Sequence, residues 1–320
     1  MGRQQYAGMS HELQQAIERY TRFHGLASGV AATPVDGLFL LRRTSPSELE
    51  HAVVRPLLCL VVQGCKQVTI GSSETLYDAG SLMIVTGSVP AASRIATASA
   101  IKPYLSMALD LDPVVITDLI SDEAAGGPSP GSQDTSADLH DAIRRLVLLM
   151  ERPESLAVLK GQLIREIHHW LLIGRQGVAV RNLGLPNSHA RRIGRAVAIL
   201  RAEFAHPLPL TRLAAAAGMS RSAFHQHFRA VTLLSPLQFQ KHLRLIEARR
   251  LILSRAFSLS RVASEVGYES TSHFSREYAR MYGRPPAKDR QQAMRWRTGG
   301  EVGNERGAKG AAGQDLANAG

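Results

Sequence analysis

Two short segments of the chain, 220–228 and 270–278, contain aromatic residues and, among them, side chains that can form strong hydrogen bonds. In the first segment, the Gln226 amide can hydrogen-bond an adenine edge with both of its ends. In the second, the Arg276 guanidinium can pair with two acceptors of guanine or contact a backbone phosphate. These residue types indicate recognition by hydrogen bonding and not the making or breaking of covalent bonds.

Both segments belong to a pattern that the chain contains twice. The first copy has Leu210, Leu213, Ala214, Ala217, Gly218, Phe224, Phe228 and Pro236, which recur 49 or 50 residues later as Leu259, Val262, Ala263, Val266, Gly267, Phe274, Tyr278 and Pro286. Each copy predicts a short amphipathic helix, a turn at the glycine, and a second helix capped by Ser220 or Ser270. This is a helix-turn-helix, whose second helix can lie in a DNA major groove. Two copies predict that one polypeptide contacts two grooves.

The positive charge of the chain is concentrated around the repeat. The whole chain has a formal net charge of +11. Residues 188–297 hold 20 Lys and Arg against 6 Asp and Glu, whereas the remainder holds 18 basic and 21 acidic residues. A basic block joined to a mildly acidic remainder is typical of a nucleic-acid-binding domain linked to another domain.

The N-terminal half has a different pattern. Residues 9–24 predict a helix capped by Ser10, and 35–111 predict short antiparallel strands in a sandwich or barrel, separated by Gly, Pro and Ser turns. A further helix is expected to begin at Asp112-Pro113, since Pro is tolerated in the first turn.

Helices and linkers account for the rest of the chain. The expected linkers are 121–136 and 174–188, and the tail after 297 is expected to be disordered. The expected helices cover 138–152, 156–173, 190–204 and 236–254.

Metal, nucleotide and catalytic sites find little support in the sequence. His168 and His169 are adjacent on a predicted helix and diverge, so we expect a helix interface and no metal site. His51 is the only histidine in 50–115, too few for a cupin metal site, and no phosphate-binding glycine loop is present. We expect no cofactor and no enzymatic activity. Cys59 and Cys65 fit no disulfide scaffold, but a thiol-based redox or electrophile sensor remains an alternative. A cupin-type enzyme fused to a DNA-binding module is a further alternative.

The chain resembles the AraC/XylS family of transcriptional regulators over about 190–293. The motif on which this resemblance rests is A-x2-VGYES-x-S-x-FSR-x-Y-x4-G-x-PP, which runs from Ala263 to Pro286. The N-terminal half is similar to the cupin-like sensor domain of one branch of this family. Its shorter motifs are VQG-x-K at 62–66, YDAG at 77–80, PY at 103–104 and LDLDP at 109–113.

The resemblance implies roles for individual residues. Base contacts are implied for Ser222, His225, Gln226, Thr271, Ser272, His273 and Arg276. We assign phosphate contacts, which supply affinity without sequence choice, to Arg221, Arg229, Lys241 and Arg244. Three positions depart from the family: Gln226 replaces a usual Arg, Leu234 a common helix-breaking Gly, and Cys65 a usual basic residue.

The expected architecture is an α+β multidomain protein with a cupin-like antiparallel β-domain and a C-terminal all-α domain with two helix-turn-helix motifs. Its segments are a helical leader at 1–30, the sensor domain at 31–120, a helical pair at 137–175, the DNA-binding domain at 190–295 and a disordered tail at 298–320. The expected partners are double-stranded promoter DNA, RNA polymerase and a small-molecule effector acting at the N-terminal domain. A homodimer is left open. No signal peptide or membrane segment is expected, which indicates a cytoplasmic protein.

Overall fold

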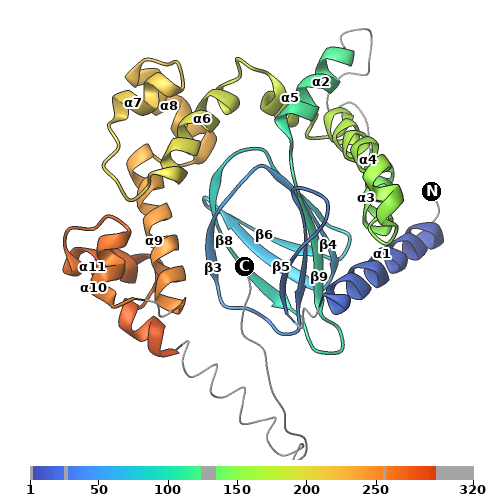
Figure 1. Cartoon of the computed structure of the whole chain (residues 1–320), viewed down its shortest axis with the longest axis horizontal. Helices are drawn as coiled ribbons and strands as arrows, with labels where there is room; N and C mark the ends of the chain where they lie inside the picture. The colour runs from blue at the N-terminus through green and yellow to red at the C-terminus, as the bar shows by residue number, and fades with distance from the viewer. Residues whose placement is uncertain (1–2, 25–27, 124–134, 255–256, 293–320) are drawn as a thin grey trace, which may run out of the picture. The chain divides into compact units, whose positions relative to one another are not determined.

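The computed structural model describes residues 3–24, 28–123, 135–254 and 257–292 (Figure 1). The chain divides into two compact units, of which the first comprises Met1–Phe204 with Leu208–Leu243. The second comprises Ala205–Pro207 with Arg244–Gly320. The expected tail at 298–320 and most of the expected linker at 121–136 lie outside the described residues.

The N-terminal half of the first unit contains two antiparallel sheets. The strands are β1 (Gly29–Ala32), β2 (Leu38–Arg43), β3 (Glu50–Val54), β4 (Leu57–Gln63), β5 (Cys65–Ile70), β6 (Ser73–Asp78), β7 (Leu82–Val85), β8 (Val89–Thr97) and β9 (Tyr104–Asp110). One sheet has the order β1-β2-β9-β4-β7, and the other has the order β3-β8-β5-β6. The expected antiparallel β-domain is therefore confirmed.

Strand β4 divides its side chains between apolar clusters on its two faces. Leu58 and Leu60 belong to a core shared with Leu13 of helix α1 (Arg3–Phe23). Cys59 and Val61 belong to the smaller clusters on the opposite face of the strand. This follows from the two-residue period of a strand. The continuous apolar run in the sequence thus reflects burial on both faces.

Four further helices accompany α1 in this half of the unit. They are α2 (Pro113–Glu123), α3 (Ser136–Leu149), α4 (Pro153–Ile173) and α5 (Gly177–Gly184). Helix α2 begins at the expected position, where the Asp112 side chain accepts a 2.7 Å hydrogen bond from the Val114 amide. Two expectations were wrong. Ser10 lies inside α1 and not at its start, and the expected linker at 174–188 contains α5.

Helix α5 forms where its local sequence resembles a linker because tertiary contacts stabilise it. Val180 is fully buried and Leu183 is 6% exposed. A Cβ atom on Gly184 would stand 2.5 Å from Ile116 Cγ2, so this glycine permits α5 to lie close to α2. Packing of this kind commonly overrides weak helix propensity.

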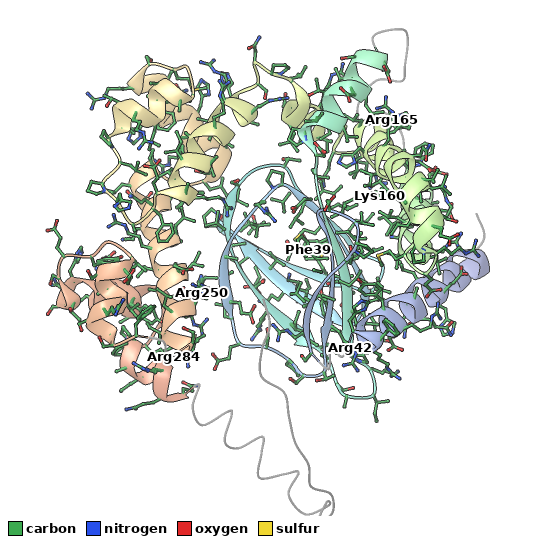
Figure 2. All side chains as sticks on the ribbon, viewed as in Figure 1. Phe39, Arg42, Lys160, Arg165, Arg250 and Arg284 are labelled. Atoms are coloured by element: carbon green, nitrogen blue, oxygen red, sulfur yellow. The ribbon has the colours of Figure 1, made fainter. Side chains whose placement is uncertain are left out.

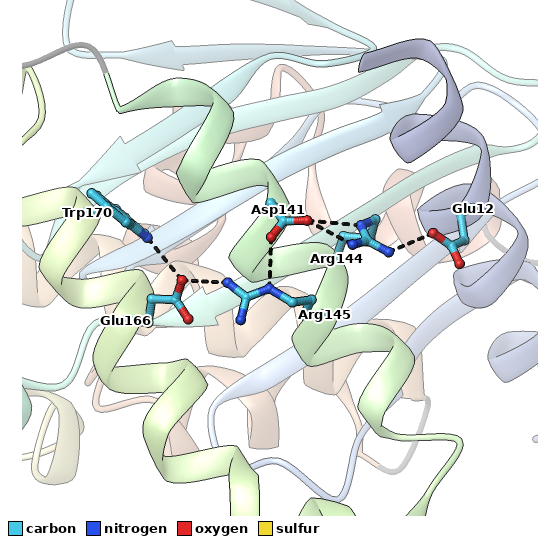
Figure 3. Close-up of polar contacts among 6 residues, drawn as sticks. All are labelled: Glu12, Asp141, Arg144, Arg145, Glu166 and Trp170. Atoms are coloured by element: carbon cyan, nitrogen blue, oxygen red, sulfur yellow. Dashed lines mark hydrogen bonds and ion pairs between the residues drawn. The ribbon is translucent and has the colours of Figure 1, made fainter. Parts of the chain in front are cut away.

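A chain of polar contacts joins α1, α3 and α4 (Figure 3). Arg144 donates to Glu12 at 2.6 Å and to Asp141 at 2.8 Å. Arg145 donates to Asp141 at 2.8 Å and to Glu166 at 2.5 Å. Burial alone would raise the pKa of Asp141, but the hydrogen bonds from the two guanidinium groups lower it. This network connects side chains of three helices at their partly exposed surface.

In the described part of the chain, six further helices form two groups of three, and a helical stretch at 286–292 follows them. The first module consists of α6 (His189–Ala202), α7 (Leu210–Ala216) and α8 (Arg221–Thr232). The second module consists of α9 (Pro236–Ser254), α10 (Leu259–Glu265) and α11 (Thr271–Tyr282). The boundaries of α9 agree with the sequence expectation, and the C-terminal part of the expected fold, with its two helix-turn-helix motifs, is confirmed.

Candidate nucleic-acid interface

Helix α8 presents a polar face opposite its aromatic core residues. The Ser220 hydroxyl accepts a 3.3 Å hydrogen bond from the Ala223 amide and so caps the helix as expected. Phe224 and Phe228 are fully buried. Five residues on the other side are exposed, namely Arg221, Ser222, His225, Gln226 and Arg229. The side chains expected to contact DNA from this helix are therefore all accessible.

Helix α11 repeats this arrangement in the second module. The Ser270 hydroxyl accepts a 3.3 Å hydrogen bond from the His273 amide, and Phe274 and Tyr278 are fully buried. Thr271, Ser272, His273 and Arg276 are exposed. Within the described part of the chain, the Arg276 guanidinium has no ion-pair or hydrogen-bond partner, so its donors are available to a ligand.

Two of the expected phosphate-contacting residues lie on α9, and both are half-buried. The guanidinium of Arg244 donates to the carbonyl oxygen of Gly267 at 2.7 Å and to that of Ala205 at 3.3 Å. Burial lowers the pKa of Arg244. Its guanidinium carbon lies 5.8 Å from the centroid of the Tyr268 ring. Arg244 thus has partners inside the second unit, in contrast to the exposed Arg221 and Arg229.

The end of α8 shows that the position of the usual helix-breaking glycine, expected at Leu234, lies one residue earlier. Leu233, and not Leu234, adopts the left-handed conformation that ends the helix, with φ of 66°. Its counterpart at the end of α11 is Gly283, with φ of 69°. A glycine in the first module would therefore be expected at 233, where leucine is strained because of its Cβ atom.

A pair of histidines links α6 to the inner edge of α8 and was not anticipated. The rings of His189 and His227 stack with centroids 3.5 Å apart and planes at 12°. Burial lowers the pKa of His227, and the charges of His189 and Arg192 lower it further. The sequence carries no signal for this contact, because the two residues belong to different helices.

The residues considered for metal or redox chemistry have structural environments. His168 is fully buried, and its Nε2 atom accepts a 3.0 Å hydrogen bond from the Asp112 amide. Burial lowers the pKa of His168 and favours the neutral ring. His168 therefore lies in the interface between α4 and the start of α2, as expected for this residue. Among the described residues, no group of three or more His, Cys, Asp or Glu side chains could hold a metal ion.

Both cysteines are buried free thiols, Cys59 in β4 and Cys65 in β5. Burial raises the pKa of each thiol, and Asp78 raises that of Cys65 further. Protonated, shielded thiols react slowly with oxidants and electrophiles. The environment of the two thiols therefore gives no support to the redox alternative.

Comparison with known families places both halves of the chain. Residues 34–179 match the model of the AraC-type transcriptional regulator N-terminus, and residues 213–292 match a helix-turn-helix domain. The chain belongs to the AraC/XylS family. The part of this family member with the helix-turn-helix motifs also resembles bacterial regulators.

The AraC/XylS relatives are similar over limited parts of their length. The HTH-type transcriptional regulator GbdR of Pseudomonas aeruginosa is 37% identical over 95 residues, which are 30% of this chain and 26% of GbdR. The virulence regulon transcriptional activator VirF of Yersinia enterocolitica is 28% identical over 156 residues, 48% of this chain and 56% of VirF. The chain thus spans between about a quarter and just over half of these relatives.

Among solved structures, the DNA-binding domain of the global transcriptional factor AdpA in complex with a target DNA is 31% identical to this family member. The match covers 33% of this chain and 95% of the AdpA domain, with a TM-score of 0.31. Among the described helices of this AraC/XylS family member, none is both long enough and apolar enough to span a membrane.

Proposed function

We propose that the protein is a sequence-specific DNA-binding transcription factor that acts at bacterial promoters. The observation that carries this proposal is the repeated design of α8 and α11. Each helix begins at a serine cap, buries its aromatic residues and exposes a polar face on the opposite side. The concentration of basic residues in 188–297 supports it, because cations supply the sequence-independent part of DNA affinity.

The proposed base contacts differ between the two helices. Ser222, His225 and Gln226 act on one half of the site, and Thr271, Ser272, His273 and Arg276 act on the other. Arg221, Arg229 and Lys241 contact phosphates. Arg244 is left out of this set because its guanidinium already donates to two carbonyl oxygens.

The experiment is footprinting of the full chain on a randomised site library. We expect two protected base clusters about 10 base pairs apart, as for helices that enter successive major grooves. Arg276→Ala should relax the base preference in one cluster, at a cost of about 1–3 kcal/mol of binding free energy. Gln226→Ala should relax the base preference in the other cluster. Lys241→Ala is the control and should weaken all sequences alike. Identical sequence preferences for the Arg276 and Gln226 variants would overturn the two-helix proposal.

Salt dependence gives an independent measure. The affinity of the full chain should fall steeply as salt concentration rises, because phosphate contacts release counterions. A flat response in an electrophoretic shift series would contradict DNA binding through these basic residues.

The N-terminal domain is proposed to regulate DNA binding and not to contact DNA itself. A small-molecule effector would have to bind two states of the protein with different affinities to change the DNA-competent population. RNA polymerase and a second copy of the chain are proposed as further partners, and no enzymatic activity is proposed. Comparing DNA affinity of the full chain with and without candidate metabolites tests the regulatory role.

A further inference from the structure

The repeat extends further than the helix-turn-helix motifs. Helices α6 and α9, which precede the two motifs, bury matching residues 52 positions apart. These are Ile193, Ala196 and Leu200 in α6, and Leu245, Ala248 and Ile252 in α9. At the same spacing, Arg192 precedes Ile193 and Arg244 precedes Leu245. Each module therefore has an arginine at the same place in its leading helix.

Arg192 contacts the turn of the first motif. Its Nε atom donates to the carbonyl oxygen of Ala217 at 2.8 Å, and its Nη2 atom donates to that of Gly218. Ala217 is the C-cap residue that follows the short helix α7, and Gly218 is the turn residue, with φ of +61°. The guanidinium thus spans two consecutive carbonyl groups at the point where the chain leaves α7.

Arg244 makes the corresponding contact in the second motif. Its Nη1 atom donates to the carbonyl oxygen of Gly267 at 2.7 Å. Gly267 has φ of +83°, and a Cβ atom there would stand 2.0 Å from the carbonyl oxygen of Ala205. The second nitrogen of Arg244 donates to that same Ala205 carbonyl. Only a glycine at 267 therefore leaves room for the Ala205 carbonyl, which is also a hydrogen-bond acceptor for Arg244.

These contacts have a clear electrostatic basis. Ala217, Gly218 and Gly267 lie just beyond the ends of α7 and α10, where carbonyl groups lack partners within the helix and the helix dipole places partial negative charge. A planar guanidinium has several donors in a fixed geometry and can satisfy more than one such carbonyl, whereas an ammonium group is a single point charge. Ser220 caps α8 two residues after Gly218, and Ser270 caps α11 three residues after Gly267. An arginine that fixes the turn therefore fixes the start of the recognition helix.

We propose that Arg192 and Arg244 are positioning residues for DNA reading, each acting through its own turn on its own recognition helix. Neither contacts DNA. This inference rests on the proposed function, because it assigns one arginine to each of the two base clusters. It differs from a phosphate contact, which would affect all DNA sequences equally.

The test uses the full-length protein with Arg192→Met, Arg244→Met and the corresponding Lys variants. Arg195→Met and Arg250→Met are matched controls, since they remove exposed arginines from the same two helices. In the randomised-site selection, Arg244→Met should lower base discrimination in the α11 cluster by about tenfold, the order of one base contact. Arg192→Met should do the same in the α8 cluster. Lys at either position should restore charge but not the base preference.

Amide hydrogen exchange without DNA provides a second readout, also for variants that bind DNA poorly. The amides of Met219 and Tyr268 close the two turns by hydrogen bonds to Ala214 and Ala263. We expect faster exchange at Tyr268 in the Arg244 variants and at Met219 in the Arg192 variants. The control variants should leave both amides unchanged.

Two results would overturn the proposal. One is unchanged protection of Met219 and Tyr268 in the Met variants. The other is an Arg244→Met protein that binds all sequences more weakly by the same factor and loses about one unit of salt slope, which is the behaviour of a phosphate contact. A wild-type protein with one protected cluster would instead refute the two-helix function, while the exchange result would still report on the turns.

Discussion

The two helix-turn-helix modules share a helix pattern but differ in the chemistry of their cores. In the first, the rings of Phe224 and Phe228 have centroids 5.3 Å apart, and Phe228 also packs against Phe239 from the start of α9, with centroids 5.5 Å apart. In the second, the residue equivalent to Phe228 is Tyr278, whose hydroxyl donates to Asp289 at 2.6 Å. An apolar core in one module thus corresponds to a partly polar one in the other.

Asp289 is the centre of the polar core in the second module. It is 2% exposed and lies 3.0 Å from Arg249 Nε and 3.3 Å from Arg284 Nε. Figure 2 labels Arg284 in the segment after α11. Buried charges are tolerated only when they are paired, and removal of one partner leaves the others without compensation. The comparison teaches that the same motif can have an apolar aromatic core or an aromatic core that is combined with a buried ionic cluster.

The largest effect that tests this comparison is expected from Asp289→Ala. Loss of the carboxylate removes the buried charge that both arginines contact, at a cost of about 3–5 kcal/mol of unfolding free energy. Urea unfolding followed by circular dichroism measures the cost, and hydrogen exchange should locate it in 244–292. Glu247→Ala, which removes a pair with exposed Arg250, is the control and should change little. A loss as small as that of the control would mean that apolar packing supports both modules.

Exchange of the aromatic residues between the modules is the second test. Tyr278→Phe removes a hydrogen bond from Asp289, and Phe228→Tyr buries a hydroxyl in an apolar core. Each should cost about 1–3 kcal/mol of unfolding free energy. Chemical denaturation of the two single variants measures it. If Phe228→Tyr were neutral, the first core would have to contain a polar partner, and the contrast between the modules would disappear.

The helix ends provide a third, smaller contrast. Leu233→Gly should stabilise the first module, because it removes the left-handed strain of leucine, whereas Gly283→Ala should destabilise the second. Each change is expected to be about 1–2 kcal/mol or less. A Cβ atom on Gly283 meets nothing within 4 Å, so that variant isolates the backbone effect. Thermal unfolding would contradict this account if both variants shifted the melting temperature in the same direction.

Alkaline pH should destabilise the second module more than the first, and this is the smallest of the expected effects. Burial raises the pKa of Tyr268 to about 12 and also raises those of Tyr278 and Tyr282. The folded state therefore retains these protons, while unfolded tyrosines begin to lose theirs near pH 10. Stability from the three residues is fully present below about pH 10 and falls above it. Residues 189–243 contain no tyrosine. Amide hydrogen exchange should therefore accelerate more between pH 8 and pH 10 in 257–292 than in 189–243. Equal acceleration in both segments would contradict this.

The sequence by itself determined the features that depend on neighbours along the chain. It established the two motifs, the serine caps of α8 and α11, the exposed faces of both helices and the limits of α9. Helical periodicity and capping act within a few residues, so the order of residue types contains the information. The base and phosphate contacts of these faces remain predictions.

Only the tertiary structure decided the roles that depend on contacts between distant residues. Arg244 resembles any basic residue of a DNA-binding helix until its guanidinium is seen between two carbonyl groups. Helix α5 resembles a linker until Gly184 lies against Ile116. Strand β4 is an apolar run whose alternate side chains enter different cores. In each case the free energy comes from groups that the fold brings together across many residues, and no local pattern encodes which groups will meet.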